Sequence, residues 1–479
     1  MIKEKPRSSK LMNGEKKLST KLVMVAIAVI IVILSRVLPL PEGLTREGLT
    51  ALAIMIAALV LWISEAMNMA VTTVILTCMI PLLKVNTPAD MFKGFGGSVF
   101  FFMVGTMAIT TALASTTIPT RIAGFILKVS KNSPVKLTIG FALGAAVLSS
   151  IMSNIPSCAM FASLAIAVLK ANGNPKPGTS NLGKCLMMAI PAGSVIGGFM
   201  TPAGSPTNII AYDLLAEMGQ PVTFLDWMII GYPIGIVLVV LFALWICLFY
   251  KPEPITNEAM ESAKDMISGA GPLTAREIKC LVVLGVMVAL WIASTWLPIF
   301  NTTVVALLGM SLFMFPGIDV ISWKDYVEQG GWDGTFLVGG VGAMSAAALS
   351  TGAASWLITT ALGGAASWSP WVICLAVSLL ICCLHWLCPS GPAVAGLAVA
   401  PIVMLAQQTG ASVTALAMIT SFWSGVTFLL PTDAVPMFTY QFRYYSIPDM
   451  VKQGWVPSLV FVVIVAFAIP IMTGLLGYV

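Results

Sequence analysis

The sequence contains little charge for its length. Charged residues make up only 9% of its 479 residues, whereas hydrophobic residues make up 58%. In a typical soluble domain about a quarter of the residues are charged. Together with the mean hydropathy of +0.96, this predicts an all-α polytopic membrane protein whose surrounding partner is the lipid bilayer. The formal charge of +5 gives no reason to expect a nucleic acid partner.

The motifs of common enzymes and pumps are also missing. The chain has a single histidine, and it contains no HExxH, GxSxG or phosphate-binding loop motif. These absences argue against metal hydrolases, triad hydrolases and ATP-driven pumps. We therefore predict that the protein is not an enzyme and uses no organic cofactor. The nine cysteines lie almost wholly in apolar runs and form no CxxC pair, which is typical of small packing residues.

What the sequence does contain is two copies of one unit. Val104-Gly105-Thr106-Met107 recurs as Val341-Gly342-Ala343-Met344, 237 positions later. The same offset carries Ser153 onto Ser390. Each serine lies in a polar, proline-containing break of an otherwise apolar segment, and a second break follows each of them, at 201–208 and 430–436. Matched breaks of this kind predict a transporter whose binding site lies between the two repeats.

Basic residues predict the orientation of the chain in the membrane. Seven of them precede the first apolar run, 22–40, so the N-terminus is expected in the cytoplasm. No small-residue cleavage site follows this run, which favours an anchoring helix in the plasma membrane over a signal peptide. Loops expected outside contain only Arg46, Lys84 and Lys93. This asymmetry favours about eleven spans plus two re-entrant hairpins, with the C-terminus outside.

The predicted organisation has five parts. They are a cytoplasmic tail (1–21), a first membrane helix (22–47), a first repeat (48–250), a cytoplasmic linker (251–278) and a second repeat (279–479). The re-entrant hairpins are expected over about 135–170 and about 369–408, and one continuous span over about 98–128. Because each repeat then crosses the membrane an odd number of times, the two repeats are expected to be inverted.

The breaks expose polar backbone groups and place polar side chains within the membrane. A helix interrupted inside a membrane exposes N–H groups at the start of one half and carbonyl oxygens at the end of the other. Glycine at Gly204 permits close approach of the backbone, and Pro206 prevents the usual hydrogen-bond ladder from resuming. Ser and Asn side chains add neutral donors and oxygens. This mixture predicts a carboxylate and a Na⁺ ion bound side by side.

At these motifs the chain resembles the divalent anion/sodium symporter family, which carries di- and tricarboxylates. The resemblance covers about residues 20–479 and depends on three stretches: Trp62–Ala66, Ser153–Ile155 and Gly204–Asn208. It implies an inverted-repeat, elevator-type transporter that forms a homodimer and couples transport to Na⁺. Each site residue below is carried over from the matching motif.

By this resemblance, the first Na⁺ site comprises Ser149, Ser153, Asn154 and Gly204. The second comprises Pro389, Ser390, Gly391, Asp433 and Ala434. The substrate contacts are Ser153, Asn154, Ile155, Ser205, Pro206, Thr207, Asn208, Ser390, Gly391, Pro392 and Thr432.

The second half departs from the family pattern. Gly391 stands where the family usually has an asparagine, and Trp386 stands where it often has a hydroxyl residue. Asp433 is foreign to the motif. Either backbone carbonyls and Asp433 rebuild the second Na⁺ site, or the coupling has changed.

Three ionisable residues stand apart from the motifs. A carboxylate inside a membrane break must be paired, hydrated, protonated or bound to a cation, so Asp433 is interpreted as functional. His385 could sense protons or contact the anion, but a buried histidine with a structural hydrogen bond is the stronger interpretation. Glu65 lies at an expected turn, where a structural role is favoured.

We therefore predict a secondary transporter of small dicarboxylates, of the succinate, malate and 2-oxoglutarate class. Transport is expected to be coupled to Na⁺ and to occur by alternating access with an elevator motion. Two alternatives stay open: a Na⁺-independent dicarboxylate exchanger and an H⁺-coupled anion transporter. A channel is disfavoured, because a continuous pore does not need two opposed hairpins.

Overall fold

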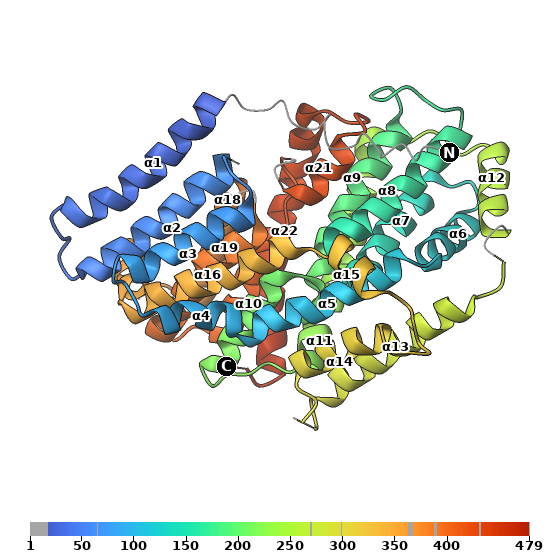
Figure 1. Ribbon diagram of the computed structural model, residues 1–479. Coiled ribbons are helices and arrows are strands. Elements are labelled where there is room, and N and C mark those ends of the chain that lie inside the picture. The colour runs from blue at the N-terminus through green and yellow to red at the C-terminus, as the bar shows by residue number, and fades with distance from the viewer. Residues whose placement is uncertain are drawn as a thin grey trace.

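The computed structural model describes residues 18–64, 66–268, 271–297, 299–362, 367–387, 390–430 and 433–478. Every regular element in these ranges is a helix (Figure 1), which confirms the predicted all-α class. Three residues singled out from the sequence, Glu65, Pro389 and Thr432, lie outside the described residues.

After α1 (Leu18–Val37), the described helices follow one order twice. The first set is α2 (Arg46–Ser64), α3 (Met69–Leu82), α4 (Pro88–Gly96), α5 (Ser98–Ala114), α6 (Ile118–Ser130), α7 (Pro134–Ser149), α8 (Asn154–Ala171), α9 (Asn181–Gly198), the short η1 (Pro202–Gly204), α10 (Pro206–Glu217) and α11 (Phe224–Tyr250). Then comes α12 (Asn257–Ser268). The second set is α13 (Ala275–Ala293), α14 (Thr302–Phe313), α15 (Trp323–Gln329), α16 (Trp332–Ser350), α17 (Ala353–Leu362), α18 (Pro370–Leu387), α19 (Gly391–Thr409), α20 (Val413–Ser424), α21 (Ala434–Tyr440) and α22 (Ile447–Leu475).

The two sets start their helices in the same way. Asn68 caps α3 by accepting the N–H groups of the second and third residues that follow it, and Asn301 caps α14 identically. Thr87 begins α4 with a capping box to Asp90, and Ser322 to Asp325 does the same for α15. Such caps satisfy N–H groups that have no partner within the helix. The two sets of helices therefore correspond locally as well as in order.

Packing between the sets is reciprocal. Helix α5 packs against α14, and its counterpart α16 packs against α3. Likewise α10 packs against α19 while α21 packs against α8. In each case a helix of one set contacts a helix of the other, and the counterparts of these two helices contact each other in turn. Two similar units related by a twofold axis produce such reciprocal contacts. Elements far apart in the sequence thereby lie side by side, as α3 and α16 do in Figure 1.

The helices differ from expectation in four places. The expected single span over about 98–128 is wrong, because α5 ends at Ala114 and α6 begins only at Ile118. The hydroxyls of Ser115 and Thr116 donate to carbonyls three residues earlier, which closes the first helix. The expected linker contains α12, which packs on α6 and α8, and the short helices α4 and α15 were not foreseen.

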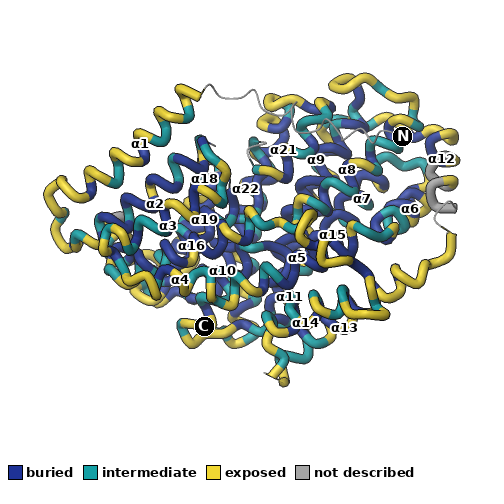
Figure 2. Tube along the Cα trace, viewed as in Figure 1, coloured by how far each residue is buried: buried dark blue, intermediate teal, exposed yellow. Residues whose placement is uncertain are grey.

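The outer surface is apolar, as a membrane protein requires. Figure 2 shows α1 mostly exposed, and this helix buries only Ala28 and Ser35 although its mean hydropathy is 2.5. Among the described residues, seven segments are long and apolar enough to cross a membrane. They are Leu18–Val37, Arg46–Ser64, Pro88–Ala114, Asn154–Ala171, Phe224–Tyr250, Gly391–Thr409 and Ile447–Leu475. Several remaining helices, including α7 and α18, are apolar but shorter than a span.

Aromatic side chains join the broken helices of the two sets. The ring of Phe199, which follows α9, stacks on Phe422 of α20 with centroids 4.2 Å apart. Phe461 of α22 contacts Phe199 and Trp423 at 5.8 and 4.5 Å. Trp227 of α11 donates its indole N–H to the Phe199 carbonyl at 3.0 Å. Because such rings are large and fully buried, they fix the two breaks relative to each other.

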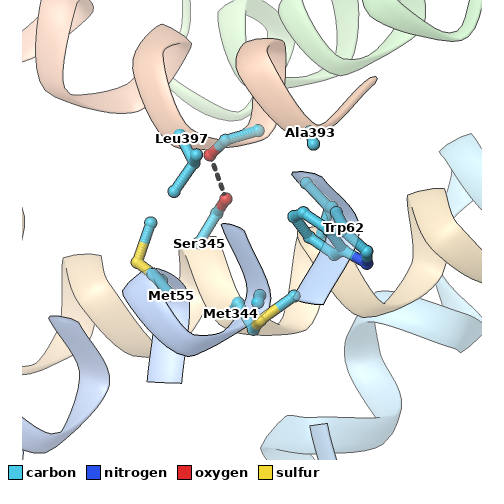
Figure 3. Close-up of a pocket in the computed structure, with 9 residues that line it drawn as sticks. Met55, Trp62, Met344, Ser345, Ala393 and Leu397 are labelled. Carbon is cyan, nitrogen blue, oxygen red and sulfur yellow. Dashed lines mark hydrogen bonds between the residues drawn. The ribbon is translucent and has the colours of Figure 1, made fainter. Parts of the chain in front are cut away.

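A second close contact joins α16 to α19, beside α2 (Figure 3). The hydroxyl of Ser345 donates to the Gly396 carbonyl at 2.6 Å. A Cβ atom at Gly396 would lie only 1.6 Å from Val341 Cγ1, so glycine is required for this approach. Met55, Trp62 and Leu397 surround a void of about 10 Å³ here, which is room for about one water molecule.

Candidate functional site

A cavity of about 460 Å³ lies where the four breaks meet. Its walls include Ser153–Pro156 and Ala203–Thr207 from the first set of helices, and Ser390–Pro392, Gly425 and Asp433–Val435 from the second. The volume is within the range of small-molecule sites. Segments that the sequence singled out separately are therefore brought together around one space.

Helix N-termini converge on this cavity. Lining residues begin α8 at Asn154, α10 at Pro206 and α19 at Gly391. The N-terminal end of a helix carries partial positive charge and N–H groups without helical partners. The N-cap serines of α8 and α19 make no side-chain capping bond to these amides. An anion in the cavity therefore meets peptide dipoles from both sets of helices.

Basic side chains are absent from the described lining of the cavity. Its charged members are two carboxylates, Asp333 and Asp433. Much of the remaining wall is apolar, and it includes Met69, Met103 and Met107. An anion in this cavity would therefore meet helix ends and neutral donors, and no basic side chain of the described lining.

The tip of the α7–α8 hairpin holds its asparagine in a fixed position. Ser149 Oγ donates to Asn154 Oδ1 at 2.7 Å, and the Ser153 N–H donates to Thr110 Oγ1 at 3.2 Å. Ser153, Asn154 and Ile155 line the cavity, while Ser149 is fully buried behind them. The amide nitrogen of Asn154 is then left to act as a donor.

Oxygen atoms cluster behind this tip around two glycines. A Cβ atom at Gly204 would lie 2.5 Å from the Gly198 carbonyl oxygen and 2.8 Å from that of Ser149. A Cβ atom at Gly198 would lie 2.3 Å from Asn154 Oδ1. Backbone and amide oxygens are the ligands that hard cations prefer. The residues present therefore fit a small alkali cation beside the anion cavity.

Asn208 lies elsewhere than its predicted role requires. It is fully buried and does not line the cavity. Its Nδ2 donates to the Gly198 and Thr201 carbonyls at 2.7 Å each, and its Oδ1 accepts from Ser421 Oγ at 2.9 Å. The side chain thus ties the first break to α20, and it supports the site instead of contacting the cavity.

The second hairpin tip reverses the arrangement of the first. In the first set, Asn154 lies against a glycine, Gly198, at the end of α9. In the second, Gly391 lies against Ser424 at the end of α20, and a Cβ atom at Gly391 would lie 2.4 Å from the Ser424 carbonyl oxygen. A larger residue at 391 is therefore excluded by the backbone, which explains the missing asparagine. The tip keeps a carbonyl oxygen but has no amide side chain there.

Asp433 and His385 lie next to each other. Asp433 caps α21 by accepting the Val435 N–H through Oδ1 at 3.0 Å, and its Oδ2 lies 3.8 Å from His385 Nε2. The histidine is 1% exposed, and its Nδ1 lies 3.0 Å from the Trp423 carbonyl oxygen. His385 and Asp433, which were interpreted separately from the sequence, therefore have to be interpreted together as one pair.

Sequence reasoning missed the opposite wall of the cavity. It consists of Met69, Met103, Thr106, Met107, Thr110, Gln329, Gly331, Asp333, Gly334 and Leu337. Four of these residues recur on α5 with helical spacing, at 103, 106, 107 and 110. The signal was present, because the repeated stretch at 104–107 overlaps this face.

Comparisons with known proteins agree with this arrangement. The chain is 25% identical to the sodium-dependent dicarboxylate transporter SdcS of Staphylococcus saprophyticus, over 95% of this chain and 92% of that protein. It is 27% identical to an uncharacterised transporter of Haemophilus influenzae, over 91% and 94% of the two chains.

A solved structure shares the fold. MtrF of Neisseria gonorrhoeae, described as illuminating a class of antimetabolite efflux pumps, matches with a TM-score of 0.55 and 12% identity. The match covers 95% of this chain and 97% of MtrF. At this identity the likeness concerns the fold alone.

The family comparison spans almost the whole chain. The model of the sodium:sulfate symporter transmembrane region matches residues 16–479. This range includes every described residue of the cavity. The protein therefore belongs to the family of the sodium:sulfate symporter transmembrane region.

Proposed function

We propose that this protein is a Na⁺-coupled secondary transporter of small dicarboxylates in the plasma membrane. One observation carries the proposal: a cavity whose described lining contains no basic side chain is lined by helix N-termini of both sets and adjoins a cluster of neutral oxygens. Such a cavity attracts an anion most strongly when a cation occupies the oxygen cluster. The sodium-dependent dicarboxylate transporter similar to this chain supports the choice of both solutes.

In this proposal the first hairpin tip binds both solutes. Nδ2 of Asn154 and the first amides of α8 donate to one substrate carboxylate. Oδ1 of Asn154, with the carbonyl oxygens of Ser149 and Gly198, coordinates Na⁺ near Gly204. Because one side chain contacts both solutes, each solute raises the affinity for the other.

Transport then requires the cavity to open on alternate sides. We place the moving body at α7–α11 with α18–α22, because these helices pack mainly on one another. The other body contains α2–α5 and α13–α16, and the contact of Ser345 with Gly396 crosses between the two. The bodies arise from inverted repeats over 48–250 and 279–479, each with a re-entrant hairpin. In this arrangement the moving body slides as an elevator within a homodimer, with the N-terminus inside and the C-terminus outside.

Transport by purified protein in lipid vesicles tests the proposal. An inward Na⁺ gradient should drive labelled succinate into the vesicles above its equilibrium level, and an equal K⁺ gradient should not. Uptake that needs only internal dicarboxylate, and ignores Na⁺, would identify an exchanger and contradict Na⁺ coupling.

A further inference from the structure

The two halves of the cavity present different charges at equivalent positions. In the first set, the hydroxyl of Ser205 caps α10 by accepting the Thr207 N–H. In the second, the carboxylate of Asp433 caps α21 in the same way through Val435. Both caps line the cavity. A plain dianion is therefore attracted at one end of the cavity and repelled at the other.

The carboxylate of Asp433 has no cationic partner on the described wall. Its ion-pair partner among the described residues is His385, and the 3.8 Å between Nε2 and Oδ2 is too long for a hydrogen bond. Nδ1 of His385 faces the Trp423 carbonyl, which can only accept, so in the neutral ring Nδ1 carries the proton. Nε2 is then an acceptor, and two acceptors face each other.

This arrangement lacks a donor. His385 Nε2 is buried and has no hydrogen-bond partner among the described residues, and Asp433, 3.8 Å from it, lines the cavity. Buried polar atoms are nearly always paired in folded proteins. Two facing acceptors can share a donor or a cation, and an ammonium group is both, because it carries a positive charge and three N–H donors. The uncompensated carboxylate of Asp433 in a cavity for anions therefore fits a substrate that carries an ammonium group.

The second carboxylate of the cavity, Asp333, already accepts a hydrogen bond. Asp333 is exposed, and its Oδ2 accepts from Asn68 Nδ2 at 3.1 Å. It belongs to the wall at the start of α16, outside the four breaks. Asp433 is thus the carboxylate that lies within a break and faces a second acceptor.

We propose that the dicarboxylate carried by this protein bears an amino group, whose ammonium binds Asp433. The proposal rests on the proposed function and narrows its substrate class to amino dicarboxylates. One carboxylate of the substrate lies at the Asn154 tip, and the ammonium donates to Asp433 Oδ2 at the second break. The charges of the substrate then match the uneven charges of the cavity.

Three four-carbon dicarboxylates test this proposal, since they differ only at one carbon. Succinate carries hydrogen there, malate a hydroxyl and aspartate an ammonium. Purified wild-type protein in vesicles takes up labelled succinate under a Na⁺ gradient, and each unlabelled compound competes. Because a hydrogen bond to a charged group is worth about tenfold in affinity or more, aspartate should half-inhibit at a concentration about tenfold lower than succinate.

Two variants remove the carboxylate and keep the helix cap. Asn and Ser cap helices as well as Asp does, and Ser is the residue found at 205. Asp433→Asn and Asp433→Ser should therefore fold, as size-exclusion chromatography and thermal unfolding can verify. Both should lose the preference for aspartate over succinate. Asp319→Asn changes an exposed carboxylate outside the described lining of the cavity, so it is the matched control and should keep that preference.

The possible outcomes distinguish a failure of this proposal from a failure of the proposed transport function. If succinate and malate compete as strongly as aspartate while Na⁺-driven succinate uptake is intact, the substrate needs no amino group. This result would overturn the present proposal and leave the proposed transport function standing. An Asp433→Asn protein with an unchanged preference but a shifted Na⁺ requirement would make Asp433 a Na⁺ ligand, and this also overturns the proposal. The absence of any Na⁺-driven uptake, with no competition by the three compounds, would overturn the proposed function as well.

Discussion

Ser149 Oγ donates a 2.7 Å hydrogen bond to Asn154 Oδ1 across the tip of the first hairpin. The positions 237 residues later are Trp386 and Gly391, so the second hairpin has neither partner of this bond. The first tip therefore offers a fixed amide to solutes, and the second offers backbone only. This difference makes the first tip the main binding point in our account.

Replacing the amide at the first tip should stop transport. In Asn154→Ala, both the donor to the carboxylate and the oxygen near Gly204 are lost, so the affinities for succinate and for Na⁺ should fall together. Uptake at low Na⁺ should fall at least about tenfold, while the protein unfolds at an unchanged temperature. Asn86→Ala, which removes an amide bonded to Ser350 far from the cavity, is the control. Normal uptake by Asn154→Ala would remove this residue from the site.

The topology of the repeats can be read by chemical labelling. Single cysteines at Lys128 and Lys176, in a cysteine-less background, should react with an impermeant thiol reagent only from the cytoplasmic side. A cysteine at Glu42 should react from the outside, because α1 crosses the membrane between the cytoplasmic N-terminus and this position. All three positions are exposed. Labelling of position 176 in intact cells would contradict the inverted arrangement.

The contact in Figure 3 lies across the proposed sliding surface. Ser345 and Leu397 line the same small void, from α16 and α19. Cysteines at these two positions, joined by a short bifunctional reagent, should stop uptake while succinate still binds in the presence of Na⁺. Each single cysteine treated with the reagent is the control. Full transport by the cross-linked protein would show that α16 and α19 do not move past each other.

A partly buried ion pair attaches α6 to the second set of helices. Arg121 Nε lies 3.1 Å from Glu277 Oε1, and these side chains are 23% and 3% exposed. Arg121→Met leaves the buried carboxylate of Glu277 without its cation, so this variant should unfold at a clearly lower temperature. The pair of Lys324 and Glu328 is 79% and 63% exposed, and Lys324→Met should change stability little. Equal unfolding temperatures for the two variants would contradict this role.

The sequence located the breaks because their signal is local. Ser, Gly and Pro interrupt apolar segments, and α8, α10 and α19 begin within the predicted stretches. The capping boxes at Thr87 and Ser322 also predict helix starts, yet the short helices they begin were overlooked. The gap between α5 and α6 was missed because its sequence, Ser115-Thr116-Thr117, contains no glycine and continues an apolar segment.

Contacts between residues that are distant in the sequence leave no local signal of this kind. The distance between His385 and Asp433 depends on how α18 lies beside the break between α20 and α21, and this is a tertiary property. The burial of Asn208 likewise depends on Ser421, which belongs to the other set of helices. The exclusion of a side chain at Gly391 became clear only from the position of the Ser424 carbonyl. The candidate residues could thus be named from sequence, but their contacts could not.

Binding of succinate to the purified protein at several Na⁺ concentrations tests the central claim most directly. If Asn154 serves both solutes, the two ligands must strengthen each other's binding by the same factor. Calorimetry should therefore show succinate affinity rising with Na⁺ in the wild-type protein, and no such rise in Asn154→Ala. A wild-type affinity for succinate that is the same with and without Na⁺ would contradict the account.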